Sequence, residues 1–240
     1  MGRERSTRHR DLWLLGIAAA VAVALAAALA FTAGKDDSRA DSARGDSQLG
    51  PVVAMGPLGD IARRVPGDPL AVGAVDAPVV MVQFSDFRCP FCAQFSRDTE
   101  PVLIDKYVNA GVLRIEWRDL PIFGDQSFAA ARAGRAAAAQ GKFWEFTRAV
   151  YADAPQTGHP DLSIERLTGF ARTAGIADID RFTADATGST FDDLISRDAS
   201  SAQSLGIPAT PAFSVNGTPV IGAQPVAEFV ALIDSAAGRS

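Results

Sequence analysis

The chain has 240 residues, a formal net charge of −5 and two cysteines. This length provides one domain of ordinary size together with an N-terminal extension. Its acidic balance excludes the basic surface that nucleic-acid binding requires, so we expect no nucleic-acid partner.

The N-terminal segment predicts a membrane anchor. Residues 12–34 carry no charge, and a helix of that length rises about 1.5 Å per residue, enough to cross a hydrocarbon core of about 30 Å. The preceding residues include four arginines, Arg3, Arg5, Arg8 and Arg10. The positive-inside rule therefore places residues 1–11 in the cytosol and the rest of the chain outside, as a single-pass signal anchor in the cell membrane. Ala28-Leu29-Ala30 resembles a cleavage site, so a cleaved signal peptide is the alternative.

The next segment predicts a linker. Residues 35–66 are rich in Asp, Ser, Gly, Arg and Pro and show little hydrophobic periodicity. This composition is typical of a flexible tether, which here lifts the following domain off the membrane. Residues 67–240 then form one domain that is large enough to bury a core.

A strand and a cysteine pair open that domain. Residues 79–84 form a short β-branched run that predicts a buried strand. The motif Cys89-Pro90-Phe91-Cys92 follows at the start of a helical pattern, and Pro90 suits the first helical position because its missing N–H group costs nothing there. Cys89 therefore lies at a helix N-terminus, where unpaired amides and the helix dipole favour a negative charge.

The helix predicted after the cysteines has an apolar face. Its members share a helical spacing: Phe91, Phe95 and Val102, extended by Leu103 and Tyr107.

The cysteine pair predicts redox chemistry. A C-x-x-C motif at a helix N-terminus can lower a cysteine pKa to about 3.5–7.5, and the thiolate is the nucleophile. We therefore predict Cys89 as the solvent-facing attacking thiol and Cys92 as the resolving thiol. A structural disulfide would close too small a ring to stabilise much. A zinc site would need two more ligands, and since His9 lies before the predicted span, only His159 remains on the same side as the cysteines. Two inert buried cysteines are the third alternative. We expect no metal and no cofactor.

Residues 112–117 alternate as a second strand, parallel to the first if the intervening helix makes a crossover. Residues from about 125 to 205 are helical in pattern and predict an inserted subdomain. Its aromatic stripe, Phe143-Trp144-Phe146-Val150, favours core over a peptide groove.

The C-terminal part predicts a hairpin and a helix. Asn216-Gly217 separates two apolar runs, residues 212–215 and 218–221, which is a strong hairpin signal. Pro219 places the second of these strands at a sheet edge. A closing helix follows from about residue 225 to residue 236.

Residues 67–240 resemble the DsbA-like branch of the thioredoxin-fold superfamily, the extracytoplasmic thiol-disulfide oxidoreductases. The resemblance rests on three segments: Phe84-Ser85-Asp86-Phe87-Arg88-Cys89-Pro90-Phe91-Cys92, Gly141-Lys142-Phe143-Trp144 and Gly206-Ile207-Pro208-Ala209-Thr210-Pro211-Ala212-Phe213. It implies an α/β thioredoxin-like fold with an inserted helical subdomain. It also implies a cis-proline opposite the cysteines at Pro211, in preference to Pro208, with Thr210-Pro211 flanking Cys89 and presenting backbone groups to an extended substrate.

Two positions depart from the family pattern. Many relatives have a glutamate six residues before the first cysteine, thought to relay a proton to the buried thiol, and this chain has Gln83 there. Asp86 can substitute for it, although an aspartate before a helix is more often a cap or a loop anchor. Phe91 stands where the best-known oxidases have histidine, so the Cys89 thiolate loses a cation and the resemblance implies a weaker oxidant.

These features support three hypotheses. The leading one is a protein-disulfide oxidase whose Cys89-Cys92 disulfide passes to reduced exported proteins. The resemblance implies reoxidation by a quinone-linked membrane oxidoreductase of the DsbB or vitamin K epoxide reductase type. The second is a reductase or isomerase kept reduced by an electron supply. The third is a membrane-tethered chaperone or binding module that uses the region from Phe143 to Val150.

Overall fold

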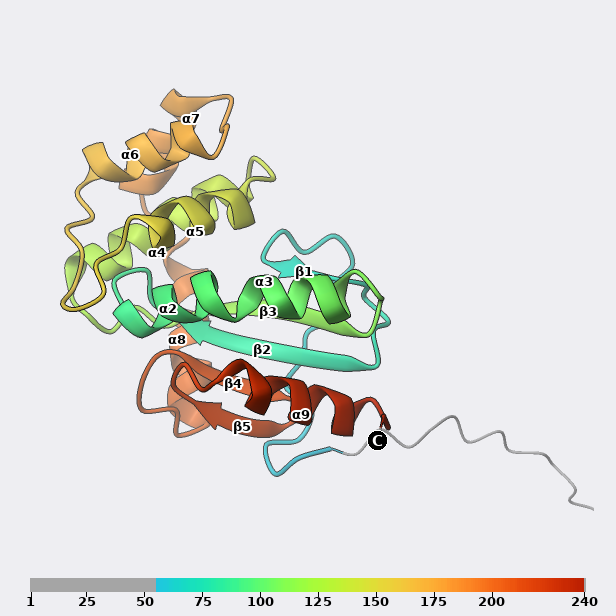
Figure 1. Ribbon diagram of the computed structural model, residues 1–240. Coiled ribbons are helices and arrows are strands. Elements are labelled where there is room, and N and C mark those ends of the chain that lie inside the picture. Colours follow the sequence, from blue (N-terminus) through green and yellow to red (C-terminus); the bar gives the residue numbers. More distant parts are fainter. Residues whose placement is uncertain (1–54, 240) are drawn as a thin grey trace, which may run out of the picture. The chain divides into compact units, whose positions relative to one another are not determined.

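The computed structural model describes residues 55–239 and contains a five-stranded sheet in the order β1-β3-β2-β4-β5 (Figure 1). The strands are β1 (Ala71–Val72), β2 (Val79–Ser85), β3 (Leu113–Asp119), β4 (Ala212–Val215) and β5 (Thr218–Ile221). β2 and β3 are parallel, and the other neighbours are antiparallel. The predicted strands and hairpin are confirmed, with Pro219 in an edge strand. β1 was not predicted, because two residues carry no periodicity.

Helices surround this sheet. They are α2 (Pro90–Asp98), α3 (Glu100–Leu103), α4 (Asp125–Ala138), α5 (Phe143–Ala152), α6 (Ile164–Thr173), α7 (Ile179–Thr187), α8 (Asp192–Ser204) and α9 (Val226–Ala236), with a π-helical turn, η1, at Ile104–Val108. The predicted crossover between β2 and β3 is formed by α2, α3 and η1. The helices from α4 to α8 match the predicted insertion and lie between β3 and β4 in the chain.

Alternation along β2 gives the sheet two apolar faces. Val79 and Met81 belong to one buried cluster, with side chains from α2 and α9 such as Phe95 and Phe229. Val80, Val82 and Phe84 belong to another, which includes Ala202 of α8. Every residue of β2 is buried. The strand that leads to the cysteines is therefore held from both sides.

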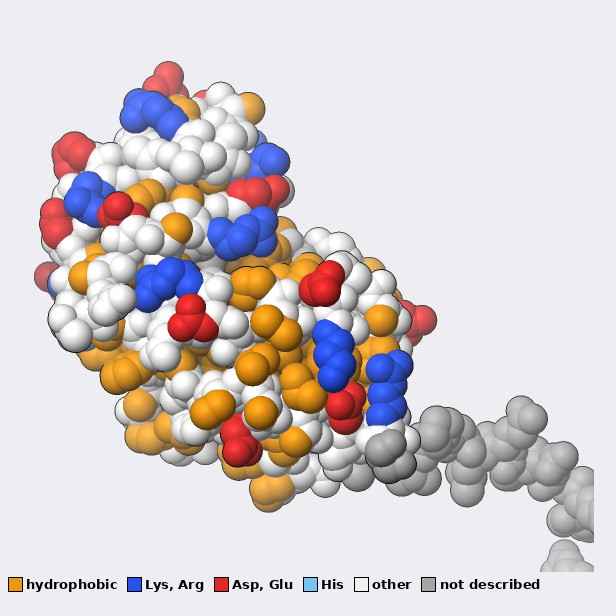
Figure 2. Space-filling model, in the orientation of Figure 1, with side chains coloured by type: hydrophobic (Ala, Val, Ile, Leu, Met, Phe, Trp, Pro, Cys, Tyr) orange, Lys and Arg blue, Asp and Glu red, His pale blue; other side chains and the backbone are white. Residues whose placement is uncertain are grey.

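The helical insertion packs around the ring of Phe87 in a buried cluster that also includes both cysteines and Trp117 of β3. The Phe87 ring lies 5.1 Å from that of Trp117 and 5.8 Å from that of Phe146. Phe143, Phe146 and Val150 are all buried, so the aromatic stripe is core, as predicted. This burial removes the surface on which the chaperone hypothesis depended. On the face in Figure 2, acidic and basic side chains are interspersed over the insertion, which is typical of a solvated surface.

The apolar face predicted for the helix after the cysteines is partly wrong. Phe95, Leu103 and Tyr107 are buried, but Phe91 is 59% exposed and Val102 is 43% exposed. The helix is not continuous, because α2 ends at Asp98 and the π-helical turn follows α3. Phe91 lies in the first turn of α2, and Val102 lies in α3 beyond the break at Thr99, so neither shares the buried face of Phe95.

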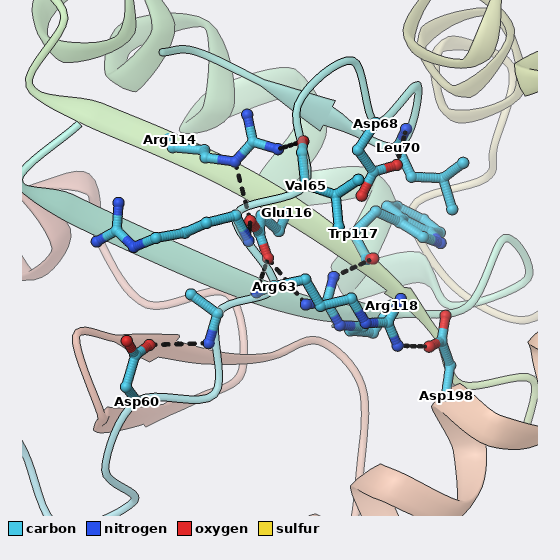
Figure 3. Close-up of polar contacts among 12 residues, drawn as sticks. Asp60, Arg63, Val65, Asp68, Leu70, Arg114, Glu116, Trp117, Arg118 and Asp198 are labelled. Atoms are coloured by element: carbon cyan, nitrogen blue, oxygen red, sulfur yellow. Dashed lines mark hydrogen bonds and ion pairs between the residues drawn. The ribbon is translucent and has the colours of Figure 1, made fainter. Parts of the chain in front are cut away.

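The predicted tether is also wrong in its last part. Residues 35–66 were expected to be flexible, but the backbone N–H groups of Arg63 and Arg64 each donate to the Glu116 carboxylate at 2.8 Å (Figure 3). The Gly56 N–H group donates to the carbonyl of Asn216 at 2.8 Å. Glu116 is fully buried in β3, and a buried carboxylate needs such donors. Residues 56–64 therefore pack against the domain.

The predicted anchor at residues 12–34, the cytosolic residues 1–11 and the first part of the tether lie outside the described residues. Within residues 55–239, no helix has both the length and the apolar character that a membrane span requires.

Candidate active site

The two cysteines lie where the central strand β2 passes into α2. Cys89 is the N-cap residue of α2, and its Sγ accepts a hydrogen bond from the backbone N–H group of Cys92 at 3.4 Å. Pro90 occupies the first helical turn, as predicted. Both cysteines are free thiols in this structure. The helix N-terminus thus directs a backbone donor at the sulfur of Cys89.

Both thiols are more enclosed than predicted. Cys89, expected to face solvent, is 1% exposed, and Cys92 is 0% exposed. The Cys89 thiol donates to the carbonyl oxygen of Thr210 at 3.2 Å, so the segment before β4 covers the sulfur. The Phe91 side chain between the cysteines projects into solvent.

The environment separates the two thiol pKa values. A hydrogen bond from the Cys92 thiol lowers the pKa of Cys89 from its ordinary value of 9.0 to about 6, helped by the backbone amides of Cys92 and Phe91 against the opposing effect of burial. Burial, together with the neighbouring Cys89, raises the pKa of Cys92 well above 9.0. At neutral pH the reduced pair therefore holds one thiolate, on Cys89, and one proton, on Cys92.

Thr210 and Pro211 lie beside this pair. The Thr210-Pro211 peptide bond is cis, as the resemblance implied, whereas Pro208 is not preceded by a cis bond. β4 begins at the next residue and pairs with β2, which holds the Thr210 carbonyl against Cys89. The carbonyl of Pro211 accepts a hydrogen bond from Gly222 at 2.8 Å.

Gln83 lies inside the sheet and reaches the cysteines only indirectly. Its Nε2 donates to the Ser85 hydroxyl at 3.0 Å, while its Oε1 is buried without a hydrogen-bond partner among the described residues. The Ser85 hydroxyl in turn forms a hydrogen bond that lowers the pKa of Cys92. Gln83 and Ser85 can therefore orient a hydrogen bond toward Cys92, but neither can change its charge at neutral pH.

Asp86 is a loop anchor. Its Oδ1 accepts from the amide of Arg88 at 2.8 Å, and its Oδ2 accepts from the amides of Ile122 and Phe123 at 2.7 and 3.3 Å. Burial raises its pKa, and these amides oppose that effect. Of the two roles considered from the sequence, the contacts favour the anchor, because the carboxylate ties the cysteine loop to the segment after β3.

Several supporting residues were not predicted. The Tyr151 hydroxyl donates to the Asp86 carbonyl at 3.0 Å, and the Arg88 guanidinium donates to the carbonyls of Phe123 and Pro160 at 2.6 and 3.0 Å. These contacts join the insertion to the cysteine loop. The partners are 35 to 72 residues apart in sequence, so no local pattern indicated them.

Comparisons with known proteins agree with this geometry. The sequence profile of the family described as Thioredoxin matches residues 66–235. The chain is 28% identical over 150 residues to a probable disulfide bond formation protein D of Bacillus cereus, covering 61% of this chain and 69% of that protein. The crystal structure of oxidised BdbD from Bacillus subtilis superposes with a TM-score of 0.68 at 23% identity, over 77% of this chain and 98% of that one, which shows a shared fold.

Other relatives are longer proteins. The chain is 32% identical over 170 residues to Na⁺/H⁺ antiporter NhaA 1 of Mycolicibacterium gilvum, covering 69% of this chain. It spans about a quarter of the antiporter's length, since the match covers 26% of that protein. One family assignment follows from the match over residues 66–235, the fold and the paired cysteines. The chain belongs to the thioredoxin family, and its fold is similar to that of DsbA-type proteins.

Proposed function

We propose that the protein is an extracytoplasmic disulfide oxidase, which passes a Cys89-Cys92 disulfide to reduced exported proteins. The observation that carries this proposal is the unequal pair of thiols, with the pKa of Cys89 lowered to about 6 and that of Cys92 raised well above 9.0. A stabilised Cys89 thiolate favours the reduced form of the pair, and a disulfide whose reduced form is stabilised is a strong oxidant.

The proposed reaction is two thiol-disulfide exchanges. A substrate thiolate attacks Cys89, the bond between Cys89 and Cys92 breaks, and Cys92 leaves as a thiolate that takes up a proton because its pKa is high. A second substrate thiolate then attacks the substrate sulfur of the mixed disulfide and releases the Cys89 thiolate. The substrate loses two electrons, and the cysteine pair gains them.

Two neighbouring features support the binding of an extended substrate. The Thr210-Pro211 segment lies beside Cys89, and the family resemblance implies that this segment contacts an extended substrate segment. Phe91, 59% exposed beside the cysteines, offers an apolar contact to a substrate that is not yet folded.

Residues 12–34 anchor this domain to the membrane in our proposal, with the domain on the extracytoplasmic side. The uncharged run and the four arginines before it support this placement. Homologous segments within chains named as Na⁺/H⁺ antiporters support a membrane-attached setting for domains of this kind. A quinone-linked membrane oxidoreductase of the DsbB or vitamin K epoxide reductase type would then reoxidise the pair, and tethering would raise the encounter rate.

The experiment that tests the proposal is oxidation of a reduced, unfolded secreted protein by the oxidised full chain. We expect stoichiometric loss of substrate thiols with the wild type and none with C89S. Thiol loss at the wild-type rate with C89S would contradict the proposal.

The reduction potential separates the oxidase from the reductase hypothesis. A value of about −120 to −180 mV supports a disulfide donor, whereas a value near about −270 mV supports a reductase or isomerase.

A further inference from the structure

A stripe of buried polar residues runs from the active-site helix α2 into α3. Cys92 and Ser96 lie one turn apart on the same face of α2, and Glu100, the first residue of α3, accepts a hydrogen bond from Ser96. All three are buried, with Glu100 only 1% exposed. Polar groups in a protein core are costly unless they are paired, so a stripe of three calls for an explanation.

Glu100 is incompletely paired. Its Oε2 accepts a hydrogen bond from the Ser96 hydroxyl at 3.3 Å, and its Oε1 has no partner among the described residues. No ion pair formed within residues 55–239 includes this carboxyl group. Burial raises its pKa to about 7, against the opposing hydrogen bond from Ser96 and the charge of Arg148. The group can therefore gain or lose a proton at neutral pH.

The titratable groups near Glu100 come from α5. Arg148 and Tyr151 belong to α5, which packs against α2. The Tyr151 hydroxyl donates its proton to the Asp86 carbonyl, and its pKa is raised well above 10.0 by burial. Tyr151 thus stays neutral, and the negative charges of both the cysteine pair and Glu100 raise its pKa further, which places it near both.

Cys92 needs a base for one step of the exchange. To resolve a mixed disulfide on Cys89, Cys92 must first lose its proton, and its pKa lies well above 9.0. Gln83 and Ser85 cannot accept that proton at neutral pH. Both oxygens of the Asp86 carboxylate are occupied by backbone amides. Glu100 has a free oxygen and a pKa near neutrality, and it is hydrogen-bonded to the hydroxyl group of Ser96, one helical turn beyond Cys92.

We propose that Glu100 is the proton acceptor for Cys92, acting through the hydroxyl group of Ser96. The Glu100 carboxylate takes the Ser96 hydroxyl proton while Ser96 takes the thiol proton of Cys92, leaving a carboxylic acid and a thiolate. The Cys92 thiolate attacks the Cys89 sulfur, the Cys89-Cys92 bond forms, and the thiolate bound to Cys89 leaves. In the opposite direction, the carboxylic acid returns the proton to Cys92. This inference rests on the proposed exchange reaction.

A two-phase reaction with Ellman's reagent tests it on the reduced full chain. In the first phase Cys89 attacks the reagent and releases one coloured thiolate. In the second phase Cys92 attacks the resulting mixed disulfide and releases another. The first phase reports the Cys89 thiolate and so tests the proposed function, whereas the second reports removal of the proton from Cys92. The two proposals therefore fail in different phases.

The variants E100Q and D98N form a matched pair, because Asp98 is an exposed carboxylate only two residues before Glu100, at the end of α2. We expect E100Q to keep the first phase and to slow the second by about 10²-fold at neutral pH, the scale of general base catalysis. The wild-type second phase rises with pH and levels off above about 7, whereas that of E100Q continues to rise. D98N should match the wild type in both phases.

A wild-type rate and pH profile in the second phase of E100Q would overturn the proposal. If E100Q does not fold, S96A replaces it, since loss of the hydroxyl group breaks the same path. S96A should slow the second phase and spare the first. An unchanged second phase in S96A would likewise overturn the proposal.

Discussion

Raising the pH through the titration of Cys89 changes how many protons accompany reduction of the cysteine pair. Below about pH 6 the reduced pair binds two protons, one on each sulfur. Above that pH Cys89 is a thiolate, while Cys92 keeps its proton because its pKa lies well above 9.0. The lowered pKa of Cys89 therefore stabilises the reduced protein. This stabilisation is complete above pH 9.0, the ordinary pKa of a cysteine, and it is lost as the pH falls through about 6.

The size of the effect follows from the two-electron chemistry. A tenfold change in the equilibrium constant corresponds to about 30 mV, so each proton taken up on reduction lowers the potential by about 30 mV per pH unit. The potential should therefore fall by about 60 mV per pH unit below pH 6 and by about 30 mV per unit above it. At about pH 8, two units past the break, the protein should lie about 60 mV above the extension of the lower line.

Redox titration over a range of pH measures this break. The full chain is equilibrated with glutathione buffers from about pH 5 to about pH 8, and free thiols are counted by alkylation. The chain has two cysteines, so every thiol counted belongs to this pair. A single slope of about 60 mV per unit up to pH 8 would refute the reasoning, because it would mean that Cys89 keeps its proton throughout.

Three further predictions concern packing, charge and redox tuning. G134A should destabilise the protein by about 1–3 kcal/mol in urea denaturation, because the added Cβ would meet the enclosed Phe87 ring at 2.8 Å. The control G169A, whose added Cβ would meet nothing within 4 Å, should stabilise the protein by up to about 1 kcal/mol. Equal effects of the two substitutions would contradict this account. E116Q should cost about 3–5 kcal/mol at neutral pH, because it leaves two buried guanidinium groups without their carboxylate. The pKa of Glu116 is lowered from its ordinary value of 4.5 to about 2, so the stability lost in E116Q should shrink as the pH falls through about 2. A loss of stability that does not depend on pH would argue against a role for the Glu116 charge. F91H should restore a cation beside the first thiol and raise the potential by about 30 mV for each unit by which that thiol's pKa falls; an unchanged potential would show that position 91 does not act on it.

The elements that the sequence predicted well are those with local signals. The buried strand at residues 79–84, the helix start at Cys89 and the hairpin around Asn216-Gly217 each depend on neighbouring residues only. The helix after the cysteines was predicted less well, because periodicity assumes one continuous helix, whereas α2 ends at Asp98 and Phe91 is exposed in its first turn.

Contacts between segments that are distant in sequence could not be predicted. The Glu116 carboxylate binds the amides of Arg63 and Arg64, which are 53 and 52 residues away, and nothing in the composition of residues 55–66 distinguishes them from a flexible tether. Burial of a carboxylate on a central strand creates the demand for those donors, and that burial becomes visible only in the fold.

The candidate site contains residues that the sequence predicted and one that the sequence interpretation missed. Cys89, Cys92 and the cis bond before Pro211 were predictable, from a motif and from a family resemblance. Glu100 carried a usable signal that the sequence interpretation missed, because Ser96 and Glu100 follow Cys92 in sequence at intervals of four residues. A glutamate in line with a buried cysteine is the pattern to look for in related chains.

The central claim is that Cys89 carries the thiolate and Cys92 the proton. Ultraviolet thiolate absorbance of the reduced full chain, followed against pH in the wild type and in C89S, tests it most directly. We predict one thiolate per wild-type chain with a midpoint at about pH 6, and none in C89S until the pH exceeds 9.0. A wild-type midpoint near 9.0, or an unchanged midpoint in C89S, would contradict the account.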